Sequence, residues 1–93
     1  MNVSIDEKEL QFLYETIAKL QTAEECKELF GDLCTYKEVE QMAQRLAAAK
    51  YLLEGDTYEE VIQKTEISSA TLSRGSKCVK YGNGYKTVLG KEE

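Results

Sequence analysis

Apolar residues recur along this chain at intervals of three and four, the spacing that places them on one face of an α-helix. Such stripes predict one helix over about residues 5–20 and another from about Ala23 that weakens at Gly31. The longest helix is expected over residues 36–54. Its apolar positions predict a short seam like that of a coiled coil, formed by Val39, Met42, Leu46, Ala49 and Leu53.

Shorter helices are predicted in the second half of the chain. One runs from Tyr58 to about Thr65 with Val61 facing inward. The next begins after Ser68 and ends near Gly82, with Leu72 facing inward. Asn83-Gly84 is a turn signal, and residues 85–89 are expected to form a last helical turn. The pattern predicts an all-α fold of five or six helices, in agreement with a chain that has no Pro.

Helix starts are marked by a Ser or Thr followed three residues later by a Glu, because each side chain can then bond the other's backbone N–H. The pattern occurs four times, at Ser4/Glu7, Thr22/Glu25, Thr35/Glu38 and Thr57/Glu60. A fifth start, capped by Ser68, carries Thr71 in place of the acid. A helix that points its N-terminus at phosphates should lack a carboxylate there, because the acid repels the phosphate and opposes the helix dipole.

Residues 57–82 fit a DNA-binding helix-turn-helix, in which two short helices are joined by a turn of three or four residues. Small and hydroxylated residues that open the second helix can touch base edges in the major groove. The cations that follow at helical spacing suit phosphates or a guanine. The candidate DNA contacts are Thr57, Ser68, Ser69, Ala70, Thr71, Ser73, Arg74, Lys77 and Lys80. An amphipathic helix with a solvated basic face is the alternative.

Glu66 occupies the turn position at which helix-turn-helix motifs often have Gly. If Glu66 must adopt a positive φ, the strain costs about 1 kcal/mol.

The uneven distribution of charge favours the DNA-binding interpretation. The net charge is −5, but residues 1–66 hold 7 basic and 15 acidic side chains, whereas residues 67–91 hold 5 basic and no acidic ones. A basic block on an acidic body is typical of a surface that binds a polyanion, although a chance cluster is the alternative.

The length of 93 residues predicts a single domain, 1–93. Within it we expect a helical dimerisation core at 1–55, the helix-turn-helix at 56–82 and a C-terminal turn and tail at 83–93. Five or six short helices leave little area for a self-sufficient core, so a symmetric dimer is expected, with a monomeric bundle as the alternative.

Composition argues against an enzyme and against a metal centre. The chain has no His, no Gly-rich phosphate loop and no cluster of metal ligands, so we expect neither catalytic residues nor a metal. Cys26, Cys34 and Cys78 are odd in number and widely spaced, as in reduced cytoplasmic proteins. Neither a secretion signal nor a membrane-spanning run is recognisable.

The stretches TYKEVEQMAQRLAAAKYLLEG and SSATLSRGSKCVKYGNGYKTVL resemble the Trp repressor superfamily, and within it the small Trp-repressor-like regulators of Firmicutes. The resemblance covers about residues 20–89 and is strongest from Thr35 onward. It implies an all-helical, intertwined homodimer with two helix-turn-helix heads that represses transcription. The two recognition helices would lie one turn of DNA apart and read a pseudo-palindromic site.

The resemblance also implies a ligand site. The Trp repressor clamps L-tryptophan between two arginines, and Arg45 and Arg74 fall at those positions. Arg74 would hold the carboxylate, and Arg45 of the other subunit would stack on the indole. Thr35 and Gly75 match the family too, so L-tryptophan or another small corepressor is the candidate ligand. Cys78 departs from the family's serine, and a solvated surface role for Arg45 is the alternative.

These features predict a cytoplasmic, homodimeric regulator of transcription that binds double-stranded DNA. Glu59 and Glu60 depart from the family's polar and basic phosphate contacts, and both acids would weaken DNA binding. The alternative is a helical protein-interaction module, in which the helix-turn-helix is a packing unit and the acidic residues 1–66 recruit a partner.

Overall fold

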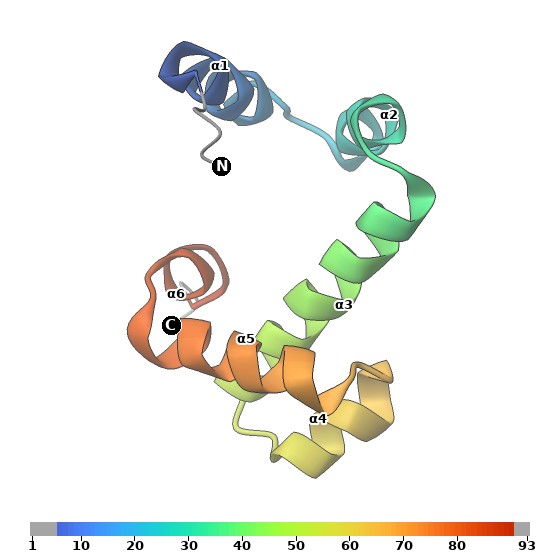
Figure 1. The fold of residues 1–93 in the computed structure, drawn as a ribbon, viewed down its shortest axis with the longest axis vertical. Coiled ribbons are helices and arrows are strands. Elements are labelled where there is room, and N and C mark those ends of the chain that lie inside the picture. Colours follow the sequence, from blue (N-terminus) through green and yellow to red (C-terminus); the bar gives the residue numbers. More distant parts are fainter. Residues whose placement is uncertain (1–5, 91–93) are drawn as a thin grey trace, which may run out of the picture. The chain divides into compact units, whose positions relative to one another are not determined.

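The computed structural model describes residues 6–90, which form six α-helices and no strand (Figure 1). The helices are α1 (Glu7–Ala18), α2 (Ala23–Leu33), α3 (Tyr36–Leu53), α4 (Tyr58–Thr65), α5 (Ser69–Tyr81) and α6 (Gly84–Leu89). The chain divides between Tyr36 and Lys37 into two compact units. The all-α class and the number of helices agree with the sequence-based prediction.

The first unit contains α1 and α2. The expected start of α1 at Ile5 and its cap at Ser4 lie outside the described residues. In the structure Asp6 caps the helix by accepting a hydrogen bond from the backbone N–H of Lys8 at 2.9 Å. α1 ends at Ala18, two residues earlier than predicted.

α2 begins at the predicted residue because Thr22 caps it. The Thr22 hydroxyl accepts from the Glu25 N–H at 3.1 Å, and the Glu25 carboxylate accepts from the N–H of Gln21 at 2.8 Å. The helix continues through Gly31 without a break, so the expected weakening at that residue is wrong.

Neither α1 nor α2 contains a buried residue. Large apolar side chains of this unit are exposed instead, and include Phe12, with 70% of its surface accessible, as well as Tyr14, Leu33 and Tyr36. Within the described residues of this unit, the apolar side chains are therefore at most half-buried.

The second unit holds a small core where the end of α3 meets the helix-turn-helix. Ala48, Val61, Ile67 and Leu72 form one buried cluster, against which Tyr51, Leu52 and Ile62 pack. Val61 and Leu72 are fully buried, as predicted. Burying an aliphatic side chain of this size stabilises the fold by about 1.5–3 kcal/mol.

The predicted seam of α3 is only partly the observed one. Of its residues only Ala49 is buried, and Leu46 is 49% exposed, whereas Ala48 enters the core. The reason is that α4 and α5 pack against the last turns of α3, where the small Ala48 lets the helices approach closely. The buried stripe is therefore set by the partner helices rather than by the spacing within α3.

α4 is held at its start by a capping box and near its end by contacts of Lys64 with residues before the helix. Thr57 and Glu60 form the predicted capping box, with the Thr57 N–H donating to Glu60 at 2.8 Å and the Glu60 N–H to Thr57 at 3.2 Å. Near the other end, the Lys64 ammonium lies 2.7 Å from Asp56 Oδ2 and over the Tyr51 ring. The hydrogen bond that Lys64 donates to the Asp56 carboxylate raises the pKa of Lys64 above its ordinary value.

The turn between α4 and α5 is made by Glu66 in the left-handed region, with φ 62° and ψ 21°. Its backbone N–H donates to the Ile62 carbonyl at 2.8 Å and so closes the end of α4. Glu66 therefore has the positive φ that the sequence analysis considered as a condition, in a turn position that often holds Gly.

α5 and α6 begin and end close to the predicted residues. Ser68 caps α5 by accepting from the Thr71 N–H at 3.2 Å, and the first turn of α5 holds no acid. α6 starts after the Asn83-Gly84 turn and is joined to the end of α5. The Lys86 ammonium donates to the Lys80 carbonyl at 3.0 Å, one of the carbonyls that the end of α5 leaves unpaired.

We expect Glu66→Gly to raise the free energy of unfolding by about 1 kcal/mol, because Gly adopts the left-handed conformation without the clash of a Cβ atom. Thermal unfolding followed by circular dichroism measures the change. Glu66→Ala is the matched control, since it removes the carboxylate but keeps the strained conformation. A gain of equal size in both variants would contradict the assignment to backbone strain.

Candidate DNA-binding and ligand site

One face of α5 is fully open to solvent and free of acids. Leu72 and Ser76 turn into the protein, and the opposite face presents only small, hydroxylated, aromatic or basic residues. The exposed residues of the helix are Ser69, Ala70, Ser73, Arg74, Lys77, Cys78, Lys80 and Tyr81. Every predicted DNA contact of this helix except the half-buried Thr71 is therefore accessible.

Three of the predicted contacts already make hydrogen bonds within the chain. Thr57 accepts from Glu60 as the cap of α4. Ser68 accepts from the Thr71 N–H and donates its own hydroxyl proton to Thr71 Oγ1 at 2.9 Å. The hydroxyl proton of Thr71 is thereby left available for an outside acceptor.

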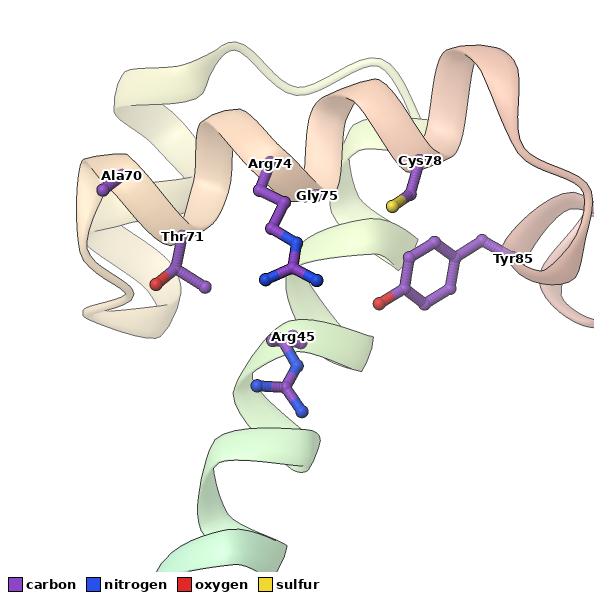
Figure 2. Close-up of a pocket in the computed structure, with 7 residues that line it drawn as sticks. All are labelled: Arg45, Ala70, Thr71, Arg74, Gly75, Cys78 and Tyr85. Carbon is purple, nitrogen blue, oxygen red and sulfur yellow. The ribbon is translucent and has the colours of Figure 1, made fainter. Parts of the chain in front are cut away.

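A cavity of about 620 Å³ lies where α3, α5 and α6 meet (Figure 2). Its lining residues are Arg45, Ala70, Thr71, Arg74, Gly75, Cys78 and Tyr85. Arg45 projects from α3, and Arg74 extends toward it from α5. Both arginines of this cavity belong to one chain, because the core cluster holds α3 against α5. The stacking of Arg45 from the other subunit, which the resemblance implied, stays a prediction.

Gly75 forms part of the cavity wall, and its missing side chain leaves room. A Cβ atom built at Gly75 would meet no heavy atom within 4 Å. Arg45 and Arg74, which were also predicted from the sequence as ligand residues, line the same cavity. Thr35 belongs to the first unit, so its part in a ligand site stays a prediction.

Tyr85 lines the cavity, although sequence reasoning assigned it no role. Its ring lies beside the Cys78 thiol, and its hydroxyl points toward the space between the arginines (Figure 2). No local pattern signals this position, because it depends on how the Asn83-Gly84 turn directs α6. For the part of the cavity wall that α5 forms, the sequence does give a signal: Arg74 and Cys78 are four residues apart, so they lie on the same face of the helix.

The second unit thus defines a helix-turn-helix protein of the all-α class. Sequence comparison matches residues 8–93 to the family described as Trp repressor protein. The chain belongs to the Trp repressor family. Members of this family are regulators rather than enzymes, which agrees with the expectation that the chain is not an enzyme.

Related proteins support this membership. The chain is 46% identical over 83 residues to the uncharacterized protein YerC of Bacillus subtilis (strain 168), covering 88% of this chain and 80% of the relative. A solved candidate Trp repressor from Staphylococcus aureus is 35% identical, with a TM-score of 0.86 over 90% of this chain and 85% of its own. A TrpR-like protein from Eubacterium eligens is 36% identical, with a TM-score of 0.84 over 92% and 93%.

Two further features of the described residues bear on the kind of protein. Residues 6–90 contain no group of three or more His, Cys, Asp or Glu side chains that could hold a metal ion. No helix in the same range is long and apolar enough to span a membrane.

Gly75→Ala should raise the free energy of unfolding by up to about 1 kcal/mol, because Ala is the better helix former and its methyl group meets empty space. Chemical denaturation measures the gain. Gly31→Ala is the matched control, since Gly31 also lies within a helix and its Cβ would also meet nothing. If Gly75→Ala lowers the free energy of unfolding and Gly31→Ala does not, another group must already fill the space beside Gly75 in solution.

Proposed function

We propose that this protein is a cytoplasmic transcriptional repressor that binds a pseudo-palindromic operator as a homodimer and is gated by a small corepressor. The observation that carries the proposal is the exposed face of α5. It presents Arg74, Lys77 and Lys80 with no acid between residues 67 and 90.

The dimensions and polarity of α5 suit a recognition helix. From Ser69 to Tyr81 the helix rises about 18 Å, at about 1.5 Å per residue. That length exceeds the roughly 12 Å width of the major groove, so its N-terminal residues can contact bases while its later cations contact the phosphates. The first turn, with Ser69 and Ala70, presents small side chains and the positive end of the helix dipole to the DNA.

The acidic residues of α4 limit the affinity of this surface for DNA. Glu60 is retained by the capping box, so it has a structural task. Glu59 is exposed in the first turn of the helix and makes the potential of this surface less positive. Repulsion from DNA phosphates keeps the binding weak enough for a ligand to control it.

The exposed apolar side chains of α1, of α2 and of the start of α3 support a homodimer. In a monomer, Phe12, Leu33 and Tyr36 would leave large apolar surfaces in contact with water. In a symmetric dimer, the same side chains of the two copies can cover one another. A dimer also provides the two recognition helices that a pseudo-palindromic site requires.

We expect Arg74→Ala combined with Lys77→Ala to abolish binding to a DNA site selected from random duplexes, because two phosphate or base contacts are lost together. Fluorescence anisotropy of labelled DNA measures binding, and circular dichroism checks that the helices remain. Lys50→Ala is the matched control, since it removes a cation from α3 outside the helix-turn-helix. Undiminished DNA binding by the double variant would contradict the placement of the interface on α5.

The dependence of DNA binding on salt separates this proposal from a protein-interaction module. A phosphate-binding surface with several cations gives a steep loss of affinity as the salt concentration rises. If selection from random duplex DNA enriches no sequence, with or without L-tryptophan present, the result would favour the protein-interaction alternative.

Sedimentation should show twice the 10.5 kDa mass of one chain. Phe12→Gln should weaken the dimer, because it removes a large exposed apolar group that the second copy would bury. Lys8→Gln on the same helix is the control and should leave the dimer intact. A wild-type chain that stays monomeric at micromolar concentration would exclude the homodimer.

A further inference from the structure

One hydroxyl group bridges the two sides of the turn between α4 and α5. Thr65 Oγ1 donates to the Val61 carbonyl at 2.8 Å and accepts from the Ile67 N–H at 3.2 Å. A threonine hydroxyl has one proton to donate and lone pairs to accept with, so it can make both bonds at once. The hydroxyl therefore joins the last turn of α4 to the backbone that leads into α5, across Glu66 with its φ of 62°.

The two backbone groups that this hydroxyl binds belong to core residues. Val61 is fully buried and Ile67 nearly so, and both lie in one cluster with Leu72 of α5. A buried N–H that loses its acceptor has to find another partner, which requires the backbone to move. The Thr65 hydroxyl thus fixes the chain immediately before Ser68, the cap of α5.

The same turn is attached to α3 by Gln44. The Gln44 Nε2 group donates to the Thr65 carbonyl at 3.4 Å and so covers one of the carbonyls that the end of α4 leaves unpaired. This bond is long, and therefore weaker than the two bonds of the Thr65 hydroxyl. It sets the position of the turn relative to α3, whereas the hydroxyl sets the shape of the turn itself.

The direction of α5 follows from the shape of this turn, because only residues 66–68 separate the two helices. A rotation of about 10° at the turn moves the far end of a helix about 18 Å long by about 3 Å. Contacts to base edges hold only within about 0.5 Å and 10–20° of their productive geometry. Attraction between exposed cations and phosphates acts over about 10 Å, so it survives such a movement.

We infer that Thr65 is a positioning residue for sequence-specific DNA binding, whose hydroxyl holds the turn so that α5 enters the major groove in one orientation. Thr65 acts through the backbone of Ile67 and needs no contact with DNA. The inference rests on the proposed function for the role of DNA, and on the hydrogen bonds of this chain for the orientation of α5.

Amide hydrogen exchange of the full chain without DNA tests the orientation. Thr65→Val keeps the β-branched shape and removes the hydroxyl, so the Ile67 N–H loses its acceptor. NMR should show the Ile67 amide exchanging at least about tenfold faster than in the wild type, with a smaller rise for the amides of α3. Thr65→Ser keeps the hydroxyl and should restore slow exchange. Unchanged exchange at Ile67, or an equal rise throughout α3, would overturn the inference.

Two kinds of DNA separate orientation from charge. Thr65→Val should weaken binding to the selected DNA site about tenfold, the size of one mismatched base pair. Its affinity for an unrelated duplex, and the salt dependence of that affinity, should stay at the wild-type values because no cation is lost. Thr65→Ser should recover most of the lost affinity. Fluorescence anisotropy measures both duplexes.

Thr16→Val is the matched control. Thr16 also donates to the carbonyl four residues earlier, that of Phe12, at 2.7 Å, but it lies on α1 in the first unit. This variant should bind both duplexes like the wild type. A loss of the same size in Thr16→Val would show that the effect of Thr65→Val is not specific to the turn, and would overturn the inference.

The remaining outcomes are also decisive. An equal loss on both duplexes would mean that Thr65→Val only lowers the folded fraction, and no loss on either would mean that the hydroxyl does not orient α5. Both results would overturn the inference. If the wild type selects no DNA sequence, the proposed function fails and the DNA part of the inference fails with it. The exchange experiment contains no DNA, so it decides separately whether Thr65 holds the start of α5.

Discussion

The contact between the end of α3 and the helix-turn-helix is the constraint on which the second unit depends. Val61 and Leu72 come from the two helices of the motif and are buried against Ala48. This one cluster fixes the angle between α4 and α5, turns the basic face of α5 outward and brings Arg45 beside Arg74. A loss of packing there would disturb the proposed DNA-binding surface and the cavity together, since no second core supports either of them within the described part of this unit.

Local hydrogen bonds decide which side chains of the helix-turn-helix remain available at its surface. The hydroxyl groups of Thr57 and Ser68 are used for caps, and Glu60 closes the capping box. Glu66 accepts backbone strain so that α5 can start in a new direction. The groups left over are the guanidinium of Arg74 and the ammonium groups of Lys77 and Lys80. The hydroxyl groups of Thr57 and Ser68 thus serve the caps, whereas these three cations of α5 are exposed to solvent.

Sequence reasoning was most accurate where structure is decided locally. The starts of α2, α4 and α5 follow from caps such as Thr57 and Ser68, which act on backbone groups within three residues. The buried stripe of α3 was predicted less well, because it depends on which helices pack there. The position of Tyr85 could not be predicted either, because the Asn83-Gly84 turn before α6 brings it to the cavity. Arg45 and Arg74 could be paired only through the family resemblance, as 29 positions separate them in the sequence.

The lack of buried residues in α1 and α2 has a consequence for the amount of protein in the cell. If a second copy covers these helices, folding and association are one equilibrium, and stability rises with the concentration of the chain. Dilute chains would then be unfolded and degraded, while concentrated ones would protect each other. A regulator built in this way responds to its own synthesis with a threshold, so its binding sites would stay empty until enough copies had accumulated.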